Sequence, residues 1–285
     1  MSRTIRFTLL AAALSLLAPG LSSAQGPTTQ SPTAQSPKTQ GQEFVVPLSA
    51  PDQPAILEVH LTQGGLAIEG FDGNQVVVES QPIESEDEIE EVDGMFRIPN
   101  TSVGLTIEEH DNTVSIGTSW TGSGVRLNVK VPRRTSLRVQ VTNGDDLVVS
   151  GVSGEHELKN VNGSIEARDM SGSVVATATN GDLTVEFQEI TKDTPMSFVS
   201  WNGDVDVTFP PSLQATLKLQ AGQGEILTDF DLTLQASAPA RTEEKRGKGY
   251  RVELNREVVG TVGGGGPEMR FKTFNGNVLV RKAGS

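Results

Sequence analysis

The chain contains no cysteine, and this absence removes two possibilities at once. None of its 285 residues is Cys. Disulfide bonds cannot stabilise the fold, and a cysteine nucleophile is excluded. Stability must therefore come from packing and from backbone hydrogen bonds.

Aromatic residues are also scarce, at 5% of the chain, whereas glycine is abundant, with 30 residues. This composition is typical of an all-β protein with a narrow core. The three histidines, His60, His110 and His156, lie about 50 residues apart, so a three-histidine metal site would have to collect them from distant strands. We interpret His156 as an imidazole at the start of a strand that is hydrogen-bonded by the preceding loop.

Positive charge is in short supply, with 23 Lys and Arg against 36 Asp and Glu, a formal net charge of −13. Loss of residues 1–24, which carry two Arg and no acid, would make the charge −15. Such a surface repels nucleic acid and anionic membranes. We therefore predict no nucleic-acid partner.

Long apolar runs are missing too. Leu9 to Ala18 is too short to span a bilayer, follows Arg3 and Arg6, and is followed by the small residues Ser22-Ser23-Ala24. We predict a secretory signal peptide at 1–24, the alternatives being a buried helix or an uncleaved anchor. The chain is then exported to the periplasm or the cell surface, with no transmembrane segment after signal cleavage.

The rest of the chain divides by composition. Residues 25–42 are rich in Gln, Thr, Ser and Pro, which predicts a disordered tether. A single domain is expected at 43–282, with a charged insert at 241–249 and an acidic run from Glu84 to Asp93.

What the sequence does contain is a repeated turn. An Asn-Gly pair, or Gln-Gly once, begins at six positions, the first five of them 19, 18, 22 and 21 residues apart: Asn143, Asn162, Asn180, Asn202, Gln223 and Asn275. This period, with no helical pattern between the turns, indicates a solenoid or a sandwich of short strands.

The residues around each turn favour the solenoid. Apolar residues alternate on both sides at the same offsets in each copy; four residues before the turn stand Val139, Leu158, Ala176, Phe198, Leu219 and Phe271. Equivalent residues can then stack at roughly 4.8 Å per coil. We predict an all-β, single-domain β-solenoid, β-helix-like, of short stacked strands with about 18–22 residues per coil. We also expect both turn residues to adopt positive φ, and the Asn side chains to hydrogen-bond along the axis.

The turn carboxylates are the first candidate site. If the coils are in register, four acids form a column: Asp145, Asp182, Asp204 and Glu225. Bound Ca²⁺ would relieve their repulsion, but the Gly-Gly-x-Gly-x-Asp pattern of calcium β-rolls is absent. We predict no metal and no cofactor, with these four residues as the Ca²⁺ candidates; the alternative is solvated turn acids.

A second candidate lies on the outward strand faces, which carry Glu166, Glu186 and Asp206. Their spacing permits the acidic pair of a glycosidase or the cleft of a polysaccharide lyase. Any solvated strand face looks similar, however, and nothing nearby would raise a carboxyl pKa by burial. We predict that the chain is not an enzyme.

Two aromatic residues, Trp201 and Phe274, each stand immediately before a turn Asn and are expected either to project outward or to pack under a loop. Exposed aromatic rings can stack on sugars. The predicted binding residues are the outward and turn residues Asp182, Glu186, Asp204, Asp206 and Trp201.

The repeated Thr-Asn-Gly-Asp and Asn-Gly-x-apolar-x-apolar motifs, with the closing run Phe271 to Val278, resemble the bacterial putative-adhesin family, a β-solenoid domain of unknown biochemical function. The resemblance covers Phe44 to Lys282 and departs from the family's simplest pattern at the charged insert and the acidic run. It implies no catalytic residues.

These observations together predict an exported, non-enzymatic β-solenoid whose acidic surface binds an unknown protein or glycan at the cell envelope, in the manner of an adhesin. A periplasmic regulatory or scaffolding protein in the envelope stress response is the alternative, and a polysaccharide-active enzyme is the third possibility.

Overall fold

The computed structural model describes residues 41–83, 91–92, 95–96, 104–119, 124–235, 240–246, 249–255 and 257–284. These residues lie in one compact unit, Thr39–Ser285. The signal peptide expected at 1–24, nearly all of the tether and most of the acidic run fall outside the described residues. No helix long and apolar enough to cross a membrane occurs among the residues described.

Each coil consists of a longer strand, a tight turn and a second strand, and its residues alternate between a buried and an outward side. Parallel pairing of equivalent strands builds two sheets around one core. The long-strand sheet contains β2 (Ala55–Gln63), β10 (Thr135–Asn143), β12 (Ser153–Asn162), the second part of β13 (Ile165–Asn180), β15 (Met196–Asn202), β23 (Glu268–Asn275) and β17 (Ala215–Gln223). The other, here called the short-strand sheet, contains β3 (Leu66–Phe71), β11 (Leu147–Ser150), the first part of β13, β14 (Leu183–Ile190), β16 (Val205–Phe209), β24 (Val278–Lys282) and β18 (Ile226–Thr228).

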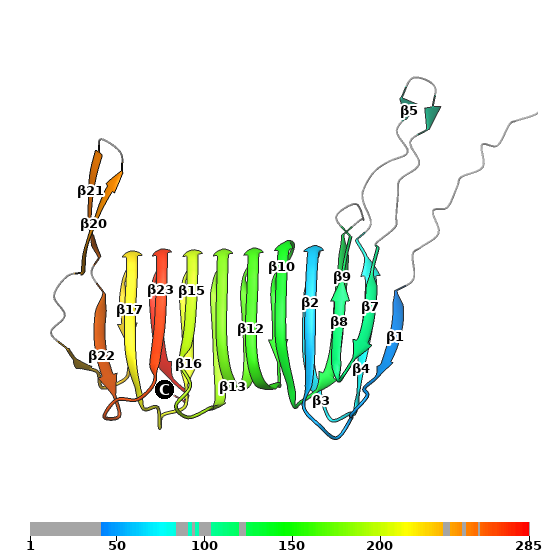
Figure 1. Ribbon diagram of the computed structural model, residues 1–285, viewed down its shortest axis with the longest axis horizontal. Helices are drawn as coiled ribbons and strands as arrows, with labels where there is room; N and C mark the ends of the chain where they lie inside the picture. Colours follow the sequence, from blue (N-terminus) through cyan, green and yellow to red (C-terminus); the bar gives the residue numbers. More distant parts are fainter. Residues whose placement is uncertain are drawn as a thin grey trace, which may run out of the picture. The chain divides into compact units, whose positions relative to one another are not determined.

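The predicted all-β solenoid is therefore confirmed, but its coils do not follow chain order. Strand β23 pairs with β15 on one side and with β17 on the other, so the last repeat lies between two earlier ones. Figure 1 shows β23, in red, between β15 and β17. Strand β2 is likewise inserted between β10 and β8 (Thr113–Gly117), and β3 between β11 and β9 (Val125–Pro132).

Antiparallel strands close both ends of the stack. At the first end, β7 (Thr106–His110) pairs with β8, and β4 (Gln75–Pro82) joins β9 to β1 (Gln42–Pro47). At the other, β22 (Val258–Val262) joins β17 to β19 (Thr233–Leu234). The predicted insert is a separate antiparallel hairpin of β20 (Ala240–Arg246) and β21 (Gly249–Asn255), and β5 (Glu91–Val92) pairs with β6 (Met95–Phe96). Reversing the strand direction changes the hydrogen-bonding edge presented to further coils.

The core is a narrow column of aliphatic side chains with one aromatic cluster. Phe187 stacks on Phe209 with ring centroids 5.0 Å apart, and Phe198 stacks on Phe271 at 5.1 Å. All four rings are at most 2% exposed. Because Phe271 belongs to β23, the cluster connects the inserted coil to the coils on one side of it.

The turns use Asn and Gly differently, which corrects the expectation that both residues adopt positive φ. The glycine has a positive φ in five of the six turns, Gly144 being the exception; Gly181 has a φ of +157° and Gly203 of +148°, and no turn Asn of the described repeats has a positive φ. Gly203 is also required sterically, because a Cβ there would lie 2.2 Å from the carbonyl oxygen of Gly181 in the adjacent coil. The Asn contributes through its side chain instead.

The turn Asn side chains form the predicted ladder along the axis. The amide nitrogens of Asn162, Asn180, Asn202 and Asn275 donate to the amide oxygens of Asn143, Asn162, Asn180 and Asn202, at 2.7–2.9 Å. Inside the turn, Ser200 Oγ donates to the Gly181 carbonyl at 2.9 Å, so a buried hydroxyl satisfies the turn backbone.

Candidate functional site

The outward side of the long-strand sheet carries a stacked pair of exposed aromatic rings. Register matches Ser200 with Thr273 and Asn202 with Asn275, which places Trp201 beside Phe274. Their ring centroids are 5.1 Å apart and the planes differ by 13°. Trp201 is 54% exposed and Phe274 43%, so the pair presents apolar surface to solvent. The rings are positioned by strand pairing and need no loop to hold them.

Residues that are paired in register across successive strands form a row along the solenoid axis. The neighbours of this aromatic pair in its row are small. Thr179 of β13 lies beside Trp201, because Ala178 pairs with Ser200 and Asn180 with Asn202. On the far side, Gly222 of β17 lies beside Phe274, because Ala221 pairs with Thr273. Gly222 has no side chain, so the ring face of Phe274 that is turned toward β17 has no side-chain neighbour in that row.

Three cations share the outward side with the rings. Lys272 and Arg270 precede Phe274 by two and four residues on β23, and Lys218 of β17 pairs with Arg270 in register. Alternate residues of a strand lie roughly 7 Å apart on one face, because a strand rises about 3.3 Å per residue. We call Trp201, Phe274, Lys272, Arg270 and Lys218 the aromatic–cationic patch.

The charges of the patch are only partly neutralised. Lys218 Nζ lies 2.6 Å from Glu268 Oε2, whereas neither Arg270 nor Lys272 takes part in an ion pair within the described part of the chain. Arg270 is exposed and Lys272 is half-buried. In a chain of net charge −13, this face therefore holds two cations that have no acidic partner among the residues the structure describes.

The acids Glu166, Glu186 and Asp206 lie on the outward side of the other sheet. Arg281 Nε donates a bifurcated hydrogen bond to the two carboxylate oxygens of Asp206 at 2.8 and 3.0 Å, which raises the pKa of Arg281. Glu166 contacts Arg168, and Glu186 is exposed. Register pairs Glu166 and Asp206 with the same residue, Thr184, which separates the two carboxylates by one intervening strand.

The turn acids form a hydrogen-bonded column in which two of the expected members are displaced. Asp182 Oδ1 accepts the backbone N–H of Asp204 at 2.8 Å, and Asp204 Oδ1 accepts that of Asn277 at 2.7 Å. These carboxylates bind amides of the next coil, and the Asp204 oxygens also accept from the Asn277 side chain.

Asp145 and Glu225 stand apart from that pair. The first turn has one extra residue, so Asp146 occupies the column and accepts the N–H of Ser164 at 2.8 Å, while Asp145 pairs with Arg126. Glu225 follows Asn277, which separates it from Asp204. Among the described residues, no group of three or more His, Asp or Glu is placed to hold a metal ion.

The histidines also lie apart. His60 and His110 are exposed, whereas His156 is 3% exposed inside the core. Its Nε2 donates to the Ser171 carbonyl at 3.3 Å. Ser171 lies within β13, in the next coil, so the partner is not the preceding loop that was expected. Burial lowers the pKa of His156 to about 4, and Nδ1 has no partner among the described groups. His156 is therefore a neutral core residue near pH 7.

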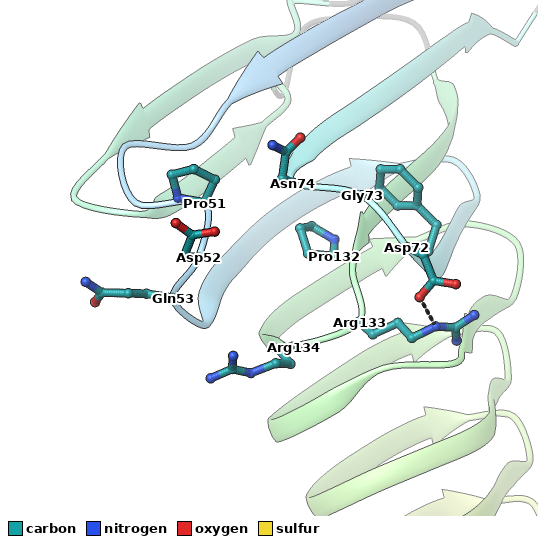
Figure 2. Close-up of a pocket in the computed structure, with 10 residues that line it drawn as sticks. Pro51, Asp52, Gln53, Asp72, Gly73, Asn74, Pro132, Arg133 and Arg134 are labelled. Carbon is teal, nitrogen blue, oxygen red and sulfur yellow. Dashed lines mark hydrogen bonds and ion pairs between the residues drawn. The ribbon is translucent and has the colours of Figure 1, made fainter.

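A cavity of about 490 Å³ lies where the loops after β1, β3 and β9 meet. In Figure 2 Arg133 points toward Asp72, with its Nε 2.9 Å from Oδ1, and Arg134 points away from that pair. The lining includes no nucleophile paired with a base: it consists of Pro51, Asp52, Gln53, Phe71, Asp72, Gly73, Asn74, Pro132, Arg133 and Arg134. The cavity offers polar contacts, not a catalytic set.

Of the five predicted binding residues, then, only Trp201 lies in the aromatic–cationic patch. Asp182 and Asp204 lie in the turns, and Glu186 and Asp206 on the other sheet. Arg270 and Lys272 were not identified from the sequence, although their alternation with Phe271 and Thr273 places them on the side of the strand that carries Phe274.

Two stacked sheets of parallel strands, joined by Asn-Gly turns with an amide ladder, define a β-solenoid. Residues 128–257 match the model of the family Toastrack DUF4097, and over this part of the chain the resemblance to a putative-adhesin family of unknown function is confirmed. No match was found among curated proteins.

Two solved structures are similar to the chain. One, described as a "putative cell adhesion protein" from Clostridium sporogenes, has a TM-score of 0.42 and 10% identity, and covers 85% of this chain and 100% of its own. The other, described as a "putative adhesin" from Bacteroides fragilis, has a TM-score of 0.38 and 9% identity, and covers 86% of this chain and 98% of its own.

Proposed function

We propose that the chain is an exported, non-enzymatic binding protein that attaches to a protein or glycan at the cell envelope, in the manner of an adhesin. The observation that carries this proposal is the Trp201–Phe274 stack, with more than two fifths of each residue exposed. Exposed aromatic rings in a rigid setting are characteristic of recognition surfaces.

A binding role also agrees with the chemistry of the described residues. The outward acids are exposed or paired with arginine, and the one strongly shifted histidine lies inside the core. General acid–base catalysis needs a titrating group that reaches substrate. The strand ladders instead provide a stiff support on which outward side chains keep fixed positions.

Export is the second part of the proposal and rests on the signal peptide expected at 1–24. The competing role is that of a periplasmic regulator or scaffold. Adhesion requires exposure at the cell surface, whereas periplasmic regulation does not, so location separates the two.

The test is protease shaving of intact cells that express the full-length chain, followed by detection of its fragments. Cleavage on unbroken cells supports an adhesin-like role. Protection until the outer layer is opened would contradict it and favour the periplasmic role, which crosslinking would then pursue. A chain retained in the cytoplasm would contradict both.

A further inference from the structure

We propose that the aromatic–cationic patch binds an acidic polysaccharide, one whose sugar rings carry carboxylate groups. This inference deepens the proposed function and rests on it: it names the ligand class and the residues that recognise it. The rings of Trp201 and Phe274 contact the apolar faces of the sugars, and Lys272 and Arg270 contact their carboxylates.

The aromatic stack has a free end. Trp201 and Phe274 cover one face of each other, and the next position in the row beyond Phe274 is Gly222. A flat ring placed over Gly222 would continue the stack, because that position carries no side chain. Pyranose rings present C–H faces that pack on aromatic rings, so a sugar suits this position.

The two cations determine the charge of the ligand. Arg270 and Lys272 have no acidic partner among the described residues, whereas three other cations on the same sheet side, Arg138, Lys159 and Lys218, are paired with Glu58, Glu157 and Glu268. An unpaired guanidinium and an unpaired ammonium on one strand are free to bind carboxylates by charge-assisted hydrogen bonds.

The acids closest in the fold leave this charge in place. Glu268 begins β23 but is paired with Lys218, and Glu257 precedes β22, beyond β17. On the other side of β23, toward β15 and β13, the row of Lys272 continues with Val199 and Thr177. The row of Arg270 continues with Ser197 and Val175. Those neighbours are uncharged, so an anion that approaches over β15 and β13 meets no repulsion from them.

The shape of the surface favours a polymer over a single sugar. The rings and the cations lie on adjacent rows that run along the solenoid axis, with a spacing of about 4.8 Å between coils. One sugar cannot cover the stack and reach Arg270 at the same time, because Arg270 lies four residues from Phe274, roughly 13 Å along the strand. Several linked sugars can contact both.

The experiment uses the purified full-length chain with a Trp120→Phe substitution, which leaves Trp201 as the only tryptophan. Its fluorescence is titrated with an oligogalacturonate, with a neutral oligoglucose of the same length, with polyglutamate, and with single-stranded DNA. We expect a saturable change with oligogalacturonate, and affinities at least about tenfold weaker for the other three probes, because each lacks either the carboxylates or the sugar faces.

Variants of the aromatic–cationic patch test which residues contribute to binding. In competition with labelled oligogalacturonate, Phe274→Ala and the pair Arg270→Gln with Lys272→Gln should each weaken binding about tenfold or more. Arg138→Gln is the matched control, because Arg138 lies in the same row as Arg270, four strands away, and is ion-paired with Glu58. It should leave the affinity unchanged, and circular dichroism should show that every variant is folded.

The possible negative results distinguish an error in the ligand class from an error in the proposed function. Equal affinity for oligoglucose, for polyglutamate or for DNA would overturn the proposal, as would loss of affinity in Arg138→Gln equal to that of the patch variants. If the chain binds washed cell envelopes and oligogalacturonate does not compete, the ligand class is wrong and the proposed function survives. If the chain binds neither envelopes nor oligogalacturonate, both fail.

Discussion

The side-chain amide of Asn275 donates a hydrogen bond to the amide oxygen of Asn202 at 2.7 Å, across 73 residues of sequence. This bond belongs to a ladder that otherwise joins coils following one another along the chain. It places the last repeat inside the stack, and the same placement brings Phe274 against Trp201. The insertion therefore creates both a structural connection and the aromatic surface.

Truncation should reveal this arrangement. Deletion of residues 267–285 removes an inner coil, leaving β15 and β17 without their shared partner. It also removes Met269, Phe271, Val278 and Val280 from the core, which costs about 6–12 kcal/mol at 1.5–3 kcal/mol per side chain, close to the whole stability of a domain. We expect an unfolded chain by circular dichroism.

The control for that truncation is replacement of residues 241–254 by a short Gly-Ser linker. This hairpin forms its own two-stranded sheet, so its removal should leave the thermal midpoint within a few degrees of the parent value. A truncated chain that melts cooperatively near the parent temperature would show that β23 is not an inner coil.

The ladder predicts a graded effect of turn substitutions. Asn202→Ala removes two ladder hydrogen bonds, to Asn180 and Asn275, and should lower the free energy of unfolding by about 1–3 kcal/mol. Asn143→Ala, at the start of the ladder, removes one such bond and should cost about half as much. Urea denaturation measures both; equal losses would argue that the ladder contributes nothing beyond local turn propensity.

Gly203 should tolerate no side chain. Its φ of +148° disfavours other residues, and a Cβ would lie 2.2 Å from the Gly181 carbonyl oxygen, so Gly203→Ala should cost about 2–4 kcal/mol. Gly117→Ala is the control, because a Cβ there has no neighbour within 4 Å. If thermal melts show the same small shift for both variants, close packing of the turn glycines is not a constraint.

His156 should make the fold sensitive to acid. Its pKa is lowered to about 4 from 6.5, so the unfolded chain binds a proton that the folded chain does not until the pH falls below about 4. Neutral His156 therefore does not reduce the free energy of unfolding above pH 6.5. As the pH falls from 6.5 to 4, the free energy of unfolding decreases by about 3 kcal/mol in all.

The variant that tests this is His156→Leu, which continues the apolar row of Leu137 and Val174. We expect its free energy of unfolding to fall less than that of the parent between pH 6.5 and 4, with His60→Gln, at an exposed site, behaving like the parent. Parallel pH profiles for His156→Leu and the parent would contradict the assigned burial.

The sequence was sufficient to predict the coils and the ladder, because both depend on local offsets. Alternation around each turn specifies which residues face inward. As expected, Leu158, Ala176 and Phe198 are all fully buried, with 0% of each residue exposed. Turn Asn residues at equal spacing likewise predict a ladder wherever the coils are in register. These features do not require knowledge of which coil is next to which.

Coil order and single-residue register could not be obtained in this way. Local patterning is the same whether β23 stacks after β17 or before it, since either position buries the same face. The extra residue in the first turn moved Asp146 into the position expected for Asp145. Arg270 and Phe274 could not be identified as neighbours of Trp201, because their proximity depends on the pairing of β15 with β23, which local periodicity does not encode.

The measurement that tests the central claim most directly is binding of the purified chain to washed cell envelopes, for the parent, the double variant Trp201→Ala with Phe274→Ala, and the control Phe44→Ala, which removes an exposed ring from the edge strand β1. The account predicts saturable binding by the parent and by Phe44→Ala, with at least about a tenfold loss in the double variant. Equal binding by the parent and a folded double variant would show that the Trp201–Phe274 stack is not the recognition surface.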